Sequence, residues 1–138
     1  MDENPTAPTA GQARSQSRRG SDLERMVVFM SKITVIGAGS VGATIANDLM
    51  IQGIASEILL IDINKQKAFG EALDIYQGAP FCSPAIVRSG DYEDAEGSDI
   101  VIITSGMPRK AGQSRLDLAQ ANVNIIKDIT PQIVKAAP

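Results

Sequence analysis

The segment from Gly37 to Gly42 reads GAGSVG and has the spacing G-x-G-x-x-G. It follows a β-branched apolar run and precedes a stretch with helical spacing, so it joins a predicted strand to a predicted helix. Gly37 allows a tight turn, Gly39 lets the backbone approach a pyrophosphate, and Gly42 lets the helix pack closely on the strand. The first helical turn, with Ser40 and Val41, offers free N–H groups and partial positive charge to an anion. This segment therefore predicts a phosphate-binding loop.

A carboxylate follows the second apolar run of the chain. Asp62 ends the run Ile58–Ile61 and lies twenty residues after Gly42. At that position an aspartate can accept both hydroxyls of an adenosine ribose and repels a 2′-phosphate, which favours NAD over NADP. We assign the next residue, Ile63, to the same cofactor-binding segment. The alternative is a glycine turn with an incidental surface aspartate, which the flanking strand and helix patterns disfavour.

A second loop, from Ser105 to Arg115, leaves the carboxyl end of the fourth apolar run. Ligands bind at that end of open α/β sheets. The loop contains three cations, among them Arg109 and Arg115, together with two glycines and a proline, which suit a loop that can move. An arginine binds a carboxylate through paired hydrogen bonds and polarises a carbonyl as charge develops on its oxygen. From the spacing alone, an ordinary solvated surface loop has equal weight.

The elements that position these loops alternate between two periodicities. Short apolar runs predict strands at 33–36, 58–61, 85–87 and 100–103. Apolar residues at helical spacing predict helices at 40–53, 65–77 and 116–135. Strands alternating with helices predict an α/β fold, a Rossmann-type doubly wound parallel sheet that contains only the first four strands. We expect the acidic stretch Asp91–Asp99 to face solvent.

Composition limits the classes of function. The 138 residues include 13 Lys plus Arg and 16 Asp plus Glu, for a net charge of −3, with one cysteine and no histidine. This mild acidity argues against nucleic-acid and membrane partners, which attract positive surfaces. We expect no metal site and no disulfide framework. Residues 1–25 have almost no apolar side chains, and we predict a disordered leader at 1–30. The absence of a targeting signal predicts a cytoplasmic protein.

From residue 32 to the end, the sequence resembles the NAD-binding half of the L-lactate/L-malate dehydrogenases. The resemblance rests on GAGSVGATIA, ILLIDINKQKAFGEALDI, GDYEDAEGSDIVIITSG and PRKAGQSRLDLAQANVNIIK. It implies that 31–138 is an NAD-binding domain whose family transfers a hydride between NAD and a small 2-hydroxy or 2-oxo acid. It also implies a homodimer or homotetramer for the full-length protein, with the helix at 40–53 in the interface.

The resemblance assigns roles to residues of the second loop. Arg115 corresponds to the arginine that polarises the substrate ketone. Asn122 corresponds to an asparagine that lines the nicotinamide and substrate pocket. Thr104, Ser105 and Gly106 match the backbone that passes the cofactor, with Ser105 in place of the usual alanine.

Arg109 bears on which acid is the substrate. At the matching position the lactate enzymes commonly carry glutamine and the malate enzymes arginine. Malate and oxaloacetate have a second carboxylate, which is costly to bury without a cation. We therefore predict malate and oxaloacetate, with lactate and pyruvate as the alternative, because the helix after the loop is more similar to the lactate branch.

The resemblance places the general-base histidine, its aspartate partner and a carboxylate-binding arginine after the last residue of this chain. The chain has no histidine, so we expect the catalytic domain to be absent and these residues alone to be inactive. A non-catalytic NAD-binding module, such as a redox sensor, is an alternative, although a sensor has no need of the paired arginines. Another Rossmann enzyme, acting for example on a sugar nucleotide, explains the glycines but not the second loop.

Overall fold

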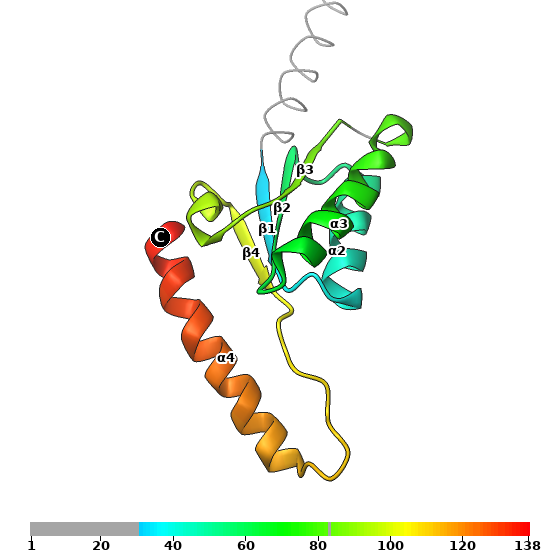
Figure 1. The fold of residues 1–138 in the computed structure, drawn as a ribbon. Helices are drawn as coiled ribbons and strands as arrows, with labels where there is room; N and C mark the ends of the chain where they lie inside the picture. The colour runs from blue at the N-terminus through cyan, green and yellow to red at the C-terminus, as the bar shows by residue number, and fades with distance from the viewer. Residues whose placement is uncertain (1–30, 83) are drawn as a thin grey trace, which may run out of the picture.

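A four-stranded parallel sheet with the order β3-β2-β1-β4 organises the structure (Figure 1). The computed structural model describes residues 31–82 and 84–138, so the predicted leader at 1–30 lies outside the described residues. In chain order the elements are β1 (Lys32–Ile36), α2 (Ser40–Gln52), β2 (Glu57–Ile61), α3 (Lys65–Gln77), η1 (Ala79–Phe81), β3 (Ile86–Ser89), η2 (Tyr92–Ala95), β4 (Ile100–Ile103) and α4 (Arg115–Ala136). The predicted α/β class with a doubly wound parallel sheet is confirmed.

The central strands β1 and β2 are apolar because both of their faces are covered. Each has four fully buried residues after a half-buried first residue, the pattern expected of strands inside a parallel sheet. The strands run side by side in register, with Ile33 opposite Ile58 and Ile36 opposite Ile61. Their carboxyl ends therefore lie together at one edge of the sheet.

The third strand was placed too early by the sequence. The prediction was 85–87, whereas β3 runs from Ile86 to Ser89. The strand continues through Arg88 because the guanidinium of this residue bonds the side chains of Glu57 and Asp94, at 2.9 Å and 3.2 Å. A charged residue with local partners thus belongs to an edge strand that apolar runs alone do not reveal.

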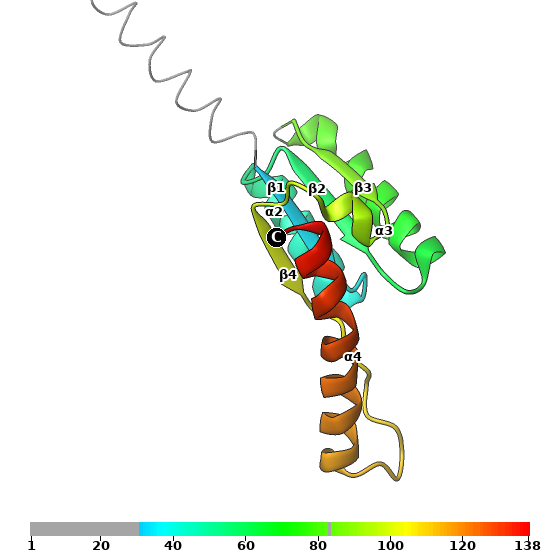
Figure 2. The same ribbon diagram turned by 90° about the vertical axis from the view of Figure 1, so that its left-hand side faces the viewer.

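Helices cover the two faces of the sheet separately (Figure 2). On one face α2 and α3 bury Ala46, Met50, Ala68 and Ala72 against residues of the sheet. On the other face η2 and the second half of α4 bury Ala95, Ile129 and Ile133. The small residues of α2 and α3 let these helices approach the strands closely, as the burial of hydrophobic surface favours.

Only the second half of α4 packs on the sheet. Its first half and the preceding loop extend past the carboxyl edge of the strands (Figure 1), and Leu116 in its first turn is 79% exposed. The helix continues through Pro131 to Ala136. No helix within the described residues combines the length and the apolar character that crossing a membrane requires.

Candidate functional site

The glycine loop forms a tight turn between β1 and α2. Gly37 has a φ of +103°, a conformation that L side chains rarely adopt, and its N–H donates to the Ile61 carbonyl at 2.7 Å. A β-carbon on Gly42 would overlap the carbonyl oxygen of Gly37. The Thr104 hydroxyl donates to that same carbonyl at 2.9 Å. The first and third glycines are therefore required by the packing of the turn itself.

The second glycine faces open space. A β-carbon on Gly39 would meet no other group within 4 Å, and Gly39 precedes α2 without a side chain that caps the helix. Ser40 and Val41 begin the helix and are both exposed. The first-turn N–H groups of α2 thus lie beside open space, an arrangement that accommodates a phosphate group.

Asp62 connects the end of β2 to the glycine loop. Its Oδ2 accepts a hydrogen bond from the Ala38 N–H at 2.7 Å, and its Oδ1 accepts one from the Asn64 N–H at 2.8 Å. Each carboxylate oxygen retains a further lone pair, and the side chain is half-buried at the carboxyl edge of the sheet. Ile63, the next residue, is fully exposed. The carboxylate can accept hydroxyl donors next to the phosphate-compatible loop.

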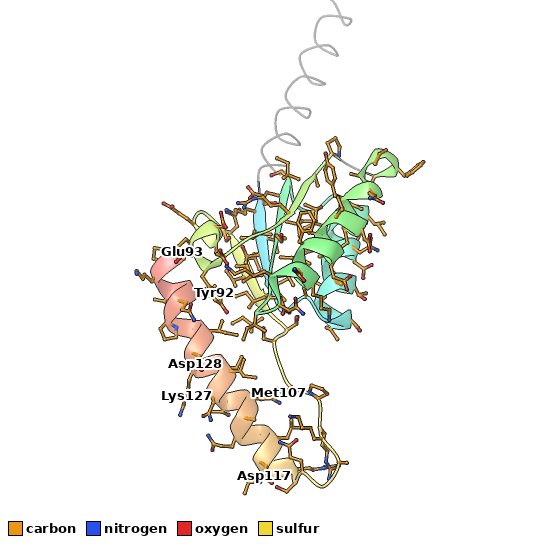
Figure 3. The ribbon with its side chains drawn as sticks, in the orientation of Figure 1. Tyr92, Glu93, Met107, Asp117, Lys127 and Asp128 are labelled. Carbon is orange, nitrogen blue, oxygen red and sulfur yellow. The ribbon has the colours of Figure 1, made fainter. Side chains whose placement is uncertain are left out.

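Tyr92, which the sequence interpretation did not single out, belongs to the same region. It begins η2 and packs, partly buried, against the core on the α4 face of the sheet; Figure 3 labels it beside α4. Burial, together with the charge of Asp62, raises the pKa of the Tyr92 hydroxyl. The only signal in the sequence was an aromatic residue within an acidic stretch in a chain with few aromatic residues.

The segment after β4 lies against both the glycine loop and α4. The Ser105 backbone nitrogen is close to Gly37, since a β-carbon on Gly37 would lie 2.8 Å from it. Further along, the Asn122 Oδ1 accepts a hydrogen bond from the Met107 N–H at 2.8 Å. The Gly106 backbone passes beside this amide, which a β-carbon there would reach at 3.5 Å. Asn122 therefore ties the start of the second loop to α4.

The tip of the second loop is held by one glutamine. The Arg109 Nε donates to the Gln113 backbone carbonyl at 2.9 Å, and the Gln113 side chain accepts from the Lys110 N–H at 3.1 Å. Gly112 turns the chain with a φ of +80°. Arg109 and Lys110 are exposed, so their charged groups face solvent from a closed turn.

Arg115 is the first residue of α4. No carboxylate within the described ranges forms an ion pair with it, and it is exposed. The Ser114 hydroxyl caps the helix by accepting from the Asp117 N–H at 3.1 Å, and Asp117 bonds back to the Ser114 N–H and hydroxyl. The bond from the Ser114 hydroxyl, and after it the bond from the Ser114 N–H, lower the pKa of Asp117. The capping box fixes the direction in which Arg115 leaves the loop.

The structure brings the predicted residues together in two groups. The glycine loop, Asp62 and Ser105 gather around the carboxyl edge of the sheet, whereas Asn122 lies on α4 beside Gly106 and Met107. Arg109 and Arg115 lie on the part of the chain that extends away from that edge, where Figure 3 labels Met107 and Asp117. Within the described ranges, no three His, Cys, Asp or Glu side chains gather as metal ligands would.

Comparison with known proteins identifies this arrangement. The family model described as the NAD-binding domain of lactate/malate dehydrogenase matches residues 31–138. The chain belongs to the lactate/malate dehydrogenase family. Its described part is the NAD-binding domain of that family, and NAD is the cofactor that the open glycine loop and Asp62 fit.

Curated relatives in this family carry lactate dehydrogenase names. The chain is 57% identical over 105 residues to an L-lactate dehydrogenase of Clostridium botulinum strain Hall, covering 76% of this chain and 33% of the relative. It is 55% identical over 108 residues to L-lactate dehydrogenase 1 of Clostridium acetobutylicum, covering 78% and 34%. The chain thus spans about a third of the length of the curated relatives it matches.

Solved structures in the family are similar under both names. A minor L-lactate dehydrogenase from Enterococcus mundtii, in a ligand-bound form, matches with a TM-score of 0.74 at 38% identity over 78% of this chain and 34% of that chain. A malate dehydrogenase from Archaeoglobus fulgidus in complex with NADH matches with a TM-score of 0.72 at 43% identity over 78% and 37%. The four-stranded sheet is therefore a fold that lactate and malate enzymes share.

Proposed function

We propose that this chain is the NAD-binding part of an oxidoreductase that transfers a hydride between NAD and a 2-hydroxy acid, with malate and oxaloacetate as the favoured pair. The observation that carries the cofactor part is the hydrogen bond from the Ala38 N–H to Asp62. It holds a carboxylate beside the glycine loop, so a ribose acceptor and a phosphate site lie next to each other.

Each half of the cofactor has residues that would hold it. The N–H groups around Gly39, Ser40 and Val41 would bind the pyrophosphate, and Asp62 would accept the adenosine ribose hydroxyls. Exposed Ile63, with Tyr92 near Asp62, would border the adenosine. At the other half, the backbone of Thr104, Ser105 and Gly106 and the amide of Asn122 would border the nicotinamide.

When bound, NAD supplies the hydride acceptor, carbon C4 of its nicotinamide ring. Arg115 would donate hydrogen bonds to the C2 oxygen of the acid and stabilise the negative charge that develops there in the reverse direction. Arg109 would bind the second carboxylate of a dicarboxylic substrate through its planar guanidinium. Both arginines lie at the projecting end of the loop and α4, so they would reach the substrate from outside the sheet.

Arg109 is the residue that favours malate over lactate. Against the methyl group of pyruvate its charge would be desolvated without a partner, whereas the second carboxylate of oxaloacetate would pair with it. Lactate and pyruvate are the second candidate pair, because the two Clostridium relatives at 57% and 55% identity are named L-lactate dehydrogenases.

The proton acceptor for the alcohol would come from outside these 138 residues, since they contain no histidine. We therefore expect the chain alone to bind NADH and to show negligible dehydrogenase activity. Malate-dependent reduction of NAD by the purified chain would contradict this expectation. The whole enzyme would be a homodimer or homotetramer, and the exposed Val41 and Ile51 of α2 offer apolar surface for that interface.

Titration calorimetry of NADH into the 138-residue chain tests the cofactor assignment. Asp62→Ala should weaken binding about ten- to hundredfold, since hydrogen bonds to charged groups contribute about 1.5–3 kcal/mol. Asp74→Ala is the matched control, because Asp74 is exposed on α3 and lies outside the proposed site. Unchanged affinity in Asp62→Ala, with circular dichroism showing that it is folded, would refute the site.

A chimera tests the substrate. Residues 31–138 would be joined to the remaining two-thirds of the Clostridium botulinum L-lactate dehydrogenase, and kcat/KM measured with oxaloacetate and pyruvate. Arg109→Gln should shift the ratio toward pyruvate by about a hundredfold. With Arg109 present, the guanidinium would pair with the second carboxylate of oxaloacetate and would have no partner against the methyl group of pyruvate. Lys110→Gln, which removes the neighbouring cation, should leave the ratio unchanged. Preference for pyruvate with Arg109 present would favour the lactate alternative.

A further inference from the structure

Asp94, which has no role in the proposed site so far, makes polar contacts with three other residues. Its Oδ2 accepts from the Asp91 N–H at 2.8 Å, and its Oδ1 accepts from the Arg88 Nη1 at 3.2 Å. Its backbone carbonyl accepts from the Lys32 ammonium. The Asp91 N–H first, and then Arg88, lower the pKa of this carboxyl. One side chain thus joins η2 to β3 and to the residue that precedes η2.

The space for this carboxylate is defined on its other side by a glycine. A β-carbon on Gly90 would overlap the Asp94 Oδ2 and would lie 3.0 Å from a methyl group of Leu59. No positive φ requires glycine at this position. Gly90 is therefore required by where Asp94 lies, and Gly90→Ala offers a way to move the carboxylate without removing it.

Further contacts connect the Asp94 region to Asp62, the proposed ribose-binding carboxylate. Asp62 accepts from the Asn64 N–H, and Asn64 caps α3 by accepting from the Lys67 N–H at 3.1 Å. Lys65, the first residue of α3, forms an ion pair with Asp91, whose N–H is bound by Asp94. A continuous set of contacts thus joins the loop after Asp62 to the start of η2.

Tyr92 lies in the chain between Asp91 and Asp94, which are joined by a hydrogen bond. It follows Asp91, whose N–H donates to Asp94, and it packs partly buried against the core group that includes Ile61, the residue before Asp62. Ala95, at the end of the turn, is fully buried, so that end is anchored by packing. The first residues of η2 depend instead on the polar contacts of Asp94.

We propose that Asp94 is a positioning residue for the adenosine half of the cofactor: it holds η2 so that Tyr92 stands beside Asp62. This inference rests on the proposed function, because it needs an adenosine at Asp62. Asp94 itself would touch neither the cofactor nor the substrate, and its effect would pass through Tyr92.

Binding of the two halves of the cofactor tests the proposal on the 138-residue chain, with AMP and nicotinamide mononucleotide as probes in calorimetry. Asp94→Asn and Gly90→Ala should each raise the Kd for AMP about fivefold, the result if η2 keeps its binding arrangement one fifth of the time. The Kd for nicotinamide mononucleotide should not change. Glu93→Gln, an exposed neighbour in η2, is the matched control and should change neither value.

Tyrosine fluorescence gives a readout that a general loss of stability would not reproduce. The chain has two tyrosines and no tryptophan, so Tyr76→Phe leaves Tyr92 as the only emitter. In that background Asp94→Asn should increase quenching of Tyr92 by acrylamide at temperatures where circular dichroism shows a folded protein. In a Tyr92→Ala background, Asp94→Asn should cause no further loss of AMP affinity.

Several outcomes would overturn the inference. Equal losses for AMP and nicotinamide mononucleotide, unchanged AMP affinity, or an additive loss in the Tyr92→Ala background would each do so. Should Asp94→Asn fail to fold, Gly90→Ala decides by the same criteria. A wild-type chain that binds neither NADH nor AMP overturns the proposed function and this inference together. A wild-type chain that binds both, with variants that bind AMP as well as it does, overturns this inference alone.

Discussion

A β-carbon on Gly42 would overlap the carbonyl oxygen of Gly37, so the first residues of α2 rest directly on the backbone of the preceding turn. The carbonyl is also bonded by the Thr104 hydroxyl from beyond β4. The turn, the start of α2 and the segment after β4 therefore meet at one oxygen atom. This contact determines how closely the helix N-terminus approaches the edge of the sheet.

Gly42→Ala should therefore destabilise the fold. We expect the free energy of unfolding to fall by about 3 kcal/mol, at the upper end for overpacking, because the overlapping atom is backbone. Gly70→Ala is the matched control, since a β-carbon there meets nothing within 4 Å and alanine should stabilise α3 by about 0.5–1 kcal/mol. Urea unfolding measures both. A Gly42→Ala variant as stable as the wild type would show that the turn adjusts freely.

The buried hydroxyl of Thr34 predicts an unusual order of stabilities. Thr34 is fully buried, and its hydroxyl bonds that of Ser98 at 2.7 Å. Ser98→Ala should cost about 1–3 kcal/mol because it leaves the Thr34 hydroxyl buried without a partner. Adding Thr34→Val should recover part of that loss, since no unpaired hydroxyl then remains. If the double variant unfolds at lower urea than Ser98→Ala, this hydrogen bond is not the cause of the loss.

Asn122 should restrain the second loop. Asn122→Ala removes the acceptor of the Met107 N–H, and a loss of about 1 kcal/mol opens the loop roughly fivefold more often. Trypsin, which cleaves after Arg109 and Lys110, should then cut the folded chain about fivefold faster, because cleavage follows the open population. Asn124→Ala is the control, since the Asn124 side chain accepts a hydrogen bond from Gln120 within α4. Equal rates for the two variants would contradict the restraint.

The start of α4 should weaken in acid. The folded pKa of Asp117 lies below its ordinary value of 3.8, first because of the Ser114 hydroxyl and then because of the Ser114 N–H. Its stabilising contribution is therefore complete above the ordinary pKa and is lost as pH falls through the folded pKa. NMR titration should give Asp117 a midpoint below 3.8, and Ser114→Ala should raise that midpoint toward its ordinary value, because it removes the hydroxyl and keeps the backbone N–H. A midpoint that Ser114→Ala leaves in place would contradict the capping contribution.

Local patterns revealed the elements that bury apolar side chains. The runs at 33–36, 58–61 and 100–103 are apolar because a parallel sheet with helices needs buried strands, and each lies in a strand of the structure. The predicted bounds of β3 differ from the structure because the second half of this strand is polar. Its residue Arg88 depends on partners from elsewhere in the chain, Glu57 and Asp94. Pairing of charges across 31 residues leaves no periodic signal.

The candidate site was predictable where backbone conformation dictates the residue. Gly37 is required by a positive φ and Gly42 by overlap with the Gly37 carbonyl, whereas a β-carbon on Gly39 would meet nothing within 4 Å. Tyr92 and Asp94 were not predicted because they interact with residues distant in the sequence or outside any periodic pattern: the charge of Asp62 contributes to the raised pKa of Tyr92, and Arg88 bonds Asp94. Asp91, Glu93, Glu96 and Asp99 are exposed as expected, whereas Asp94 of the same stretch is half-buried and forms an ion pair with Arg88.

The first half of α4 projects from the sheet, and the helix is packed at its other end. Its first buried residue is Ile129, 14 positions (129 minus 115) beyond Arg115, which corresponds to about 21 Å of helix. A tilt of about 5° at the packed end would displace the Arg115 backbone by about 2 Å over that length. A slight repacking around Ile129 would thus move the Arg115 guanidinium by a distance large enough to make or break a hydrogen bond.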